Sequence, residues 1–244
     1  MFASLVKEKR ISTSMAVTAV ILGIVGTVFM FIGAVAAAEA AYYDDFDMMT
    51  GASAVMILAG LLGLVSGILQ AVVMYQWSCG LKTNIENTRV IMTGLSKKIT
   101  DSEKTDVIDL FSTRLSGMQL PVWAYWLYVV LYIIGLFSGA YAILFFVLGF
   151  IFLAIYLHGV FSVSESLQDM KGKIYPFLLE KVVFEDIRKI NKRNIGLFIL
   201  LSIVTFGIYW YYLIIKLSSE INAYTDIDSR LRESVYSKLE EKKA

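Results

Sequence analysis

The chain of 244 residues contains little of what catalytic and metal-binding sites usually need. It has one cysteine, Cys79, which excludes an intrachain disulfide and any multi-cysteine metal site. It has one histidine, His158, so that histidine-rich metal or proton-relay chemistry is also excluded. No nucleophile or orienting partner for this histidine can be identified. We therefore expect no catalytic residue, no cofactor and no metal, and we expect that the protein is not an enzyme.

Charged residues are also scarce. They make up 18% of the chain, whereas hydrophobic residues reach 57%, against about 45–50% in soluble domains. Uncharged runs of roughly membrane-spanning length, about 20 residues, separate the charged blocks. A soluble helix would interleave charges every few residues. The sequence therefore predicts an all-α integral membrane protein, a bundle of about five transmembrane helices with amphipathic cytoplasmic helices. The net charge of +1 indicates no nucleic-acid partner.

The uncharged run 122–157 is too long for one crossing, since a helix of that length would reach about 54 Å against a hydrocarbon core of about 30 Å. We expect it to turn at Ser138–Ala140. The runs and charged blocks give seven segments: 1–14, a cytoplasmic N-terminus; 15–77, a transmembrane hairpin of spans 1 and 2; 78–120, a cytoplasmic helical loop; 121–160, a transmembrane hairpin of spans 3 and 4; 161–194, a second cytoplasmic helical loop; 195–217, span 5; and 218–244, an amphipathic C-terminal tail.

The first apolar run, 15–38, has a second interpretation as a secretory signal peptide, because AVAAAEA near 34–40 resembles a cleavage site. The run exceeds the roughly 7–15 residues of a signal core, which favours a membrane anchor.

Small residues recur on one side of each of the first two predicted spans. Such faces let membrane helices approach closely. We expect an antiparallel pair of spans 1 and 2, with a homodimer face as the alternative. The candidate packing residues are Gly23 and Ala37 in span 1 and Ala59, Gly63, Gly67, Gln70 and Ala71 in span 2.

The polar segments carry apolar residues at helical spacing, which predicts amphipathic helices. One is expected around Val107–Leu115, one from Pro176 through Phe184 to Ile190, and one in the tail. The tail helix is open to three interpretations: a partner-binding helix, a surface-lying helix or a solvated end.

The distribution of lysine and arginine predicts the orientation. The N-terminus has three, the 78–120 stretch six and the 161–194 stretch seven, whereas the two opposite loops have none. By the positive-inside rule, the N-terminus and both long stretches are expected in the cytoplasm, with the protein in the cell membrane.

The run ILLSIVTFGIYWYY at 199–212, followed by Lys216 and Glu220–Asn222, resembles the prokaryotic membrane-protein family catalogued as domain of unknown function 4234. One motif copy is present, over about 195–223. The motif residues are Thr205, Gly207, Ile208, Tyr209, Lys216 and Asn222. The resemblance implies no substrate and no catalytic residue.

The motif itself predicts a bend, because the Thr205 hydroxyl can bond to the Leu201 carbonyl and Gly207 loosens the helix. Two topologies follow. A single crossing over 195–217 would put the C-terminus outside, and this is the topology we expect. A re-entrant hairpin hinged at Thr205–Gly207 is the alternative, because the tail is rich in basic residues.

The predicted function is that of a non-enzymatic scaffold or accessory subunit of a membrane complex. Its cytoplasmic or C-terminal amphipathic helices would contact a protein partner, and a homo-oligomer is a further option. The alternative is a small transporter or channel, but no charged residue lies inside an apolar run, where ion pathways usually need one.

Overall fold

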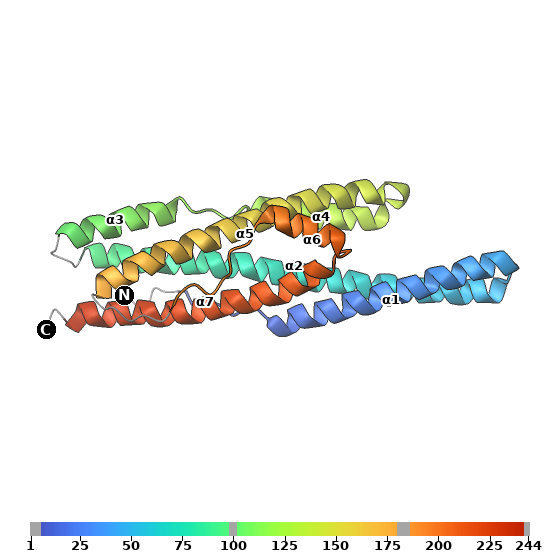
Figure 1. Cartoon of the computed structure of the whole chain (residues 1–244), viewed down its shortest axis with the longest axis horizontal. Helices are drawn as coiled ribbons and strands as arrows, with labels where there is room; N and C mark the ends of the chain where they lie inside the picture. Colours follow the sequence, from blue (N-terminus) through green and yellow to red (C-terminus); the bar gives the residue numbers. More distant parts are fainter. Residues whose placement is uncertain (1–5, 98–101, 180–185, 242–244) are drawn as a thin grey trace. The chain divides into compact units, whose positions relative to one another are not determined.

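The computed structural model describes residues 6–97, 102–179 and 186–241, and within these ranges all regular structure is helical. Figure 1 shows the helices in chain order. Their bounds are α1 Thr13–Tyr43, α2 Phe46–Ser96, α3 Ser102–Ser116, α4 Val122–Phe137, the 3-10 turn η2 Gly139–Tyr141, α5 Ala142–Leu179, α6 Ile195–Val204 and α7 Ile208–Glu241. The chain divides into two compact units, Ser12–Met74 and a second formed by Met1–Ile11 with Tyr75–Ala244.

The first unit is an antiparallel helix pair, made of α1 and the beginning of α2. Asp44 ends α1 in a left-handed conformation with φ 54°, which lets the chain reverse. A Cβ at Gly26 would lie 3.2 Å from the Ala59 carbonyl oxygen, so the two backbones are in close contact. Ser66 Oγ donates to the Ala19 carbonyl at 2.7 Å, and Gln70 Nε2 donates to Ser66 Oγ at 2.8 Å. Small residues and one polar pair therefore hold the helices together.

The second unit contains the α4–α5 hairpin, which turns at η2 where the sequence predicts a turn. Gly139 has φ +53°, a conformation that favours glycine. At the other end of the hairpin, a Cβ at Gly159 would lie 2.2 Å from Pro121 Cδ. Only glycine allows the start of α4 to approach α5 this closely.

In the part of the chain that the structure describes, three helices are long and apolar enough to cross a membrane, namely α1, α2 and α5, whereas the apolar helices α4 and α6 are shorter. The predicted class of all-α membrane bundle is confirmed, and the predicted count of five crossings is approximate. Helix α5 has 38 residues and is about 57 Å long, almost twice the hydrocarbon thickness. Its polar C-terminal part therefore continues beyond the bilayer.

The polar segments differ from the predicted loops. Much of 78–120 is a direct continuation of α2 to Ser96, followed by α3, which buries Ile108, Phe111 and Leu115 as its spacing predicts. The prediction of a separate helix that begins near Pro176 is wrong. Pro176 lies inside the end of α5, and residues 186–194 are not helical. Phe184, which was assigned to that helix, lies outside the described residues.

The predicted span 195–217 is not one helix. It breaks at Thr205–Gly207 into α6 and the start of α7, because Phe206 and Gly207 have φ values of 50° and 86°. The predicted bond from Thr205 Oγ1 to the Leu201 carbonyl is present at 2.7 Å.

The segment that precedes α6 contacts the middle of α7. Arg193, which precedes α6, pairs with Glu220 on α7, with 2.7 Å between Nη1 and Oε2. A single crossing would hold these residues on opposite sides of the bilayer, and the ten residues of α6 extend only about 15 Å. In the structure α6 and α7 therefore form a helical hairpin, which is the arrangement of the alternative topology.

Candidate functional site

Four charged side chains are buried together in the second unit, on the parts of the helices that extend beyond the apolar runs. They are Lys171 on α5, Asp228 and Arg232 on α7, and Glu8 in the segment before α1. Lys171 and Asp228 are 0% exposed and Arg232 is 4% exposed. Lys171 follows the end of the uncharged run 122–157 by about 21 Å of helix, which places the cluster outside the hydrocarbon. We call these four residues the ion network.

Asp228 is the centre of the ion network. Its Oδ2 lies 2.9 Å from Lys171 Nζ and 3.0 Å from Arg232 Nε. Asn84 Nδ2 on α2 donates to the same oxygen at 2.7 Å, and the Tyr175 hydroxyl on α5 donates to Oδ1 at 2.7 Å. A buried carboxylate needs this many partners, because an unpaired charge away from water is very costly.

Glu8 balances the second cation. Arg232 Nη2 donates to Glu8 Oε1, and Asn87 Nδ2 donates to the same oxygen at 3.0 Å. Asn87 also exchanges hydrogen bonds with the backbone of Val6, at 2.8 and 3.1 Å. Two carboxylates therefore face two cations, and the ion network joins the N-terminal segment to α2, α5 and α7.

Burial and charge act differently on the pKa values of the network. Burial lowers the pKa of Lys171 to about 8, against an opposing effect of the neighbouring Asp228 carboxylate. Burial raises the pKa of Asp228, but Lys171, Arg232 and the hydrogen bonds outweigh it, so that this pKa lies below its ordinary value of 3.8. At neutral pH Asp228 is therefore ionised and Lys171 remains mostly protonated, which is the state that an ion pair needs.

A second set of polar contacts holds the N-terminal segment and the loop before α6 against α7. The backbone N–H and carbonyl of Ile11 bond to the Asn222 side chain at 2.8 and 2.9 Å. Glu220 accepts from Asn191 Nδ2 at 2.8 Å in addition to its pair with Arg193. These contacts lie on the same helix as the ion network and have the same effect, which is to fix α7 against the rest of the unit.

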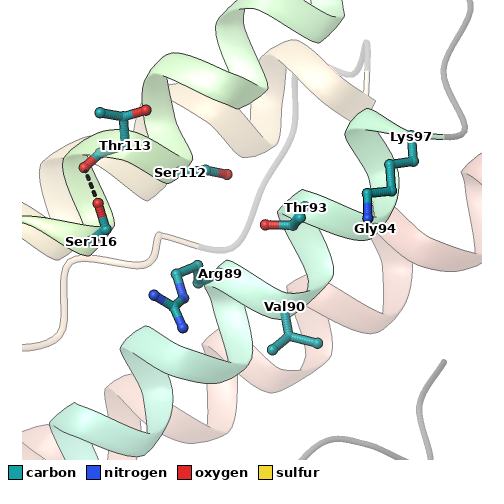
Figure 2. Close-up of a pocket in the computed structure, with 8 residues that line it drawn as sticks. All are labelled: Arg89, Val90, Thr93, Gly94, Lys97, Ser112, Thr113 and Ser116. Carbon is teal, nitrogen blue, oxygen red and sulfur yellow. Dashed lines mark hydrogen bonds between the residues drawn. The ribbon is translucent and has the colours of Figure 1, made fainter.

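A groove between α2 and α3 has a volume of about 630 Å³ (Figure 2). Its lining residues are Arg89, Val90, Thr93, Gly94, Lys97, Ser112, Thr113 and Ser116. Arg89 pairs with Glu86 on its own helix at 2.7 Å. The Thr113 and Ser116 hydroxyls donate to backbone carbonyls of α3. The polar groups of Arg89, Thr113 and Ser116 are thus engaged within their own helices, and the accessible lining of the groove is mainly apolar.

The predicted packing residues lie in the helix pair of the first unit. Gly23, Ala59 and Gln70 are buried, whereas Ala37, Gly63, Gly67 and Ala71 are half-buried. The position of Gly63 differs from the expectation in one respect: a Cβ at Gly26 would lie 3.3 Å from the Gly63 backbone nitrogen, but a Cβ at Gly63 would meet no atom within 4 Å. The close approach therefore depends on Gly26 rather than on Gly63.

The motif residues divide between the turn and α7. Thr205, Gly207, Ile208 and Tyr209 form the turn and the first residues of α7, where Thr205 Oγ1 accepts from the Tyr209 N–H at 3.0 Å. Further along α7, Asn222 binds the N-terminal segment and Lys216 is exposed. The amphipathic face of the tail is buried within its own unit, as Ile221, Tyr224, Ile227 and Val235 show.

Sequence reasoning did not find the ion network. Its members lie far apart in the chain, and each one alone resembles an ordinary surface charge. One signal was present: Asp228 falls at a position of α7 where the apolar spacing predicts a buried side chain. Among the described residues, no group of three or more histidine, cysteine, aspartate or glutamate side chains is arranged to hold a metal ion.

Long apolar helices that continue into a polar helical bundle define a helical integral membrane protein. Within it, residues 193–235 match the family described as Domain of unknown function (DUF4234), in a single copy, as the motif predicts. The matched part extends from Arg193 through the α6–α7 hairpin and includes Asp228 and Arg232. Comparisons with curated proteins and with solved structures find no match.

Proposed function

We propose that this protein is a non-enzymatic scaffold or accessory subunit of a complex in the cell membrane. By the positive-inside rule, its N-terminus and its polar helical bundle face the cytoplasm. The observation that carries the proposal is the ion network, since it uses buried charges to fix helices rather than to line an open cavity. Lys171 and Asp228 are fully buried and saturated by neighbours on three helices.

A rigid bundle is what a docking platform needs, because a pre-organised surface loses little conformational entropy on binding. The apolar face of α7 is buried inside the unit and is not accessible to a protein partner. A partner would therefore bind an exposed surface of the bundle. We assign it to the α2–α3 groove, which is concave, has a mainly apolar accessible lining and includes the exposed side chain of Thr93.

The transporter alternative finds no comparable support. It would be favoured by a polar cavity lined by Ser66, Gln70 and Thr205. Ser66 and Gln70 instead bond to each other in the helix pair, and Thr205 bonds to Leu201 and Tyr209 within its own hairpin.

The test is co-purification of the tagged protein from native membranes in a mild detergent. We expect a stoichiometric protein partner with the wild type, and its loss with Thr93→Arg, which adds a large cation in the groove. Ser234→Arg, at an exposed position on α7, is the matched control and should retain the partner. A protein that purifies alone and conducts a solute in reconstituted vesicles would contradict the proposal and favour the transporter. Equal retention by both variants would place the contact outside the groove.

A further inference from the structure

The turn between α6 and α7 carries an exposed apolar tip. Phe206 is 97% exposed, and the neighbouring Ile203, Val204 and Ile208 are 65–68% exposed. None of the residues from Ile195 to Ile215 is charged. Contiguous apolar surface of this kind marks a site of protein or membrane contact.

The backbone of the turn is suited to a surrounding without water. Irregular backbone at membrane depth is tolerated only where its polar groups are satisfied, because lipid offers no hydrogen-bond partner. The N–H groups of Phe206 and Gly207 donate to the carbonyls of Ile203 and Ser202, at 3.1 and 2.8 Å. The next two N–H groups, of Ile208 and Tyr209, both donate to Thr205, to its carbonyl and its hydroxyl. All four donors of the turn are thus bonded inside the hairpin.

The height of the hairpin corresponds to half of a bilayer. Its base is fixed by the Arg193–Glu220 pair, and the Arg193 guanidinium carbon lies 6.0 Å from the centre of the Phe161 ring on α5. From Glu220 back to Ile208, α7 extends about 18 Å, whereas from Phe161 back to Ala142, α5 extends about 28 Å. Half of the hydrocarbon core is about 15 Å. In Figure 1 the α6–α7 turn accordingly ends short of the α4–α5 turn.

We infer that the α6–α7 hairpin inserts into one leaflet only and that its tip, centred on Phe206, binds lipid acyl chains near the bilayer midplane. The hairpin enters and leaves on the side of Arg193, so the C-terminal end of α7 lies on the side where α6 begins. It displaces lipid in that leaflet and leaves the other leaflet to the α4–α5 turn.

The test is the depth of a nitroxide label attached to single cysteines in a Cys79→Ser background, in reconstituted phospholipid vesicles. The positions are Phe206→Cys at the tip, Phe137→Cys at the exposed end of α4, and Ser237→Cys on the polar part of α7. Relaxation by oxygen, which concentrates in hydrocarbon, is compared with relaxation by a water-soluble nickel complex. Labelling with a membrane-impermeant thiol reagent from either side gives an independent measure.

We expect position 206 to show the highest ratio of oxygen to nickel relaxation and to be labelled by the impermeant reagent from neither side. Positions 137 and 237 should be labelled from opposite sides. Labelling of 206 from the same side as 137 would overturn the inference, because the hairpin would then cross both leaflets. Nickel relaxation at 206 equal to that at 237 would also overturn it, because the tip would then lie in water.

Discussion

The substitution Asp228→Asn removes the central negative charge of the ion network with almost no change in side-chain shape. Lys171 and Arg232 then remain buried with one carboxylate, Glu8, instead of two. The new amide nitrogen can also face Asn84 Nδ2 or the two cations, all of which are donors. The variant therefore combines an uncompensated buried charge with a donor–donor conflict.

The expected loss of unfolding free energy is about 3–5 kcal/mol, as for other buried pairs in which one partner is removed. The matched control is Asp226→Asn, two residues earlier on the same helix. Asp226 pairs with Arg10 at 2.8 Å, but its side chain is 46% exposed. Surface pairs of this kind contribute roughly 0–1 kcal/mol, so the control should be nearly neutral.

Both variants can be measured by unfolding in a mild detergent and by amide hydrogen exchange in the polar part of α7. We expect Asp228→Asn to unfold at a lower temperature than the wild type and to lose exchange protection in α7. If Asp226→Asn and Asp228→Asn behave alike, the ion network does not fix the bundle and the reasoning is refuted.

Three further predictions concern packing and pH. Gly26→Leu should weaken cysteine crosslinking between α1 and α2, whereas Gly63→Leu should not, because a Cβ at Gly63 meets open space; equal effects would contradict this assignment. Gly159→Ala should destabilise the α4–α5 hairpin by about 1–3 kcal/mol through overpacking, but Gly149→Ala, whose nearest contact is 3.7 Å, should be tolerated in the same unfolding assay. The lowered pKa of Asp228 contributes stability that is present above pH 3.8 and is lost as the pH falls through the folded value, so the wild type should lose more stability in acid than Asp228→Asn.

The sequence predicts the membrane part of the fold well, because its signals are local. Charge-free runs mark the apolar helices, and the excess length of 122–157 requires the turn that the structure places at Gly139. The bend at Thr205 could likewise be predicted from a hydroxyl within reach of a carbonyl one turn earlier.

The topology of the last segment could not be predicted in the same way. Its length and lack of charge fit a crossing as well as a hairpin, and the decision depends on contacts that are distant in sequence. Glu220 pairs with Arg193, and Asn222 binds the backbone of Ile11, which is 211 residues earlier in the sequence. The ion network escaped prediction for the same reason, since Glu8 and Arg232 are at opposite ends of the sequence.

The central claim is that the segment before α1 and the polar part of α7 lie on one side of the membrane in one helical bundle. The most direct measurement is a pair of fusions, before Met1 and after Ala244, to a fluorescent protein that matures only in the cytoplasm, with alkaline phosphatase fusions as the complement. We predict fluorescence and no phosphatase activity from both ends, because the Arg10–Asp226 pair cannot form across a bilayer. Fluorescence from the N-terminal fusion together with phosphatase activity from the C-terminal one would contradict the account.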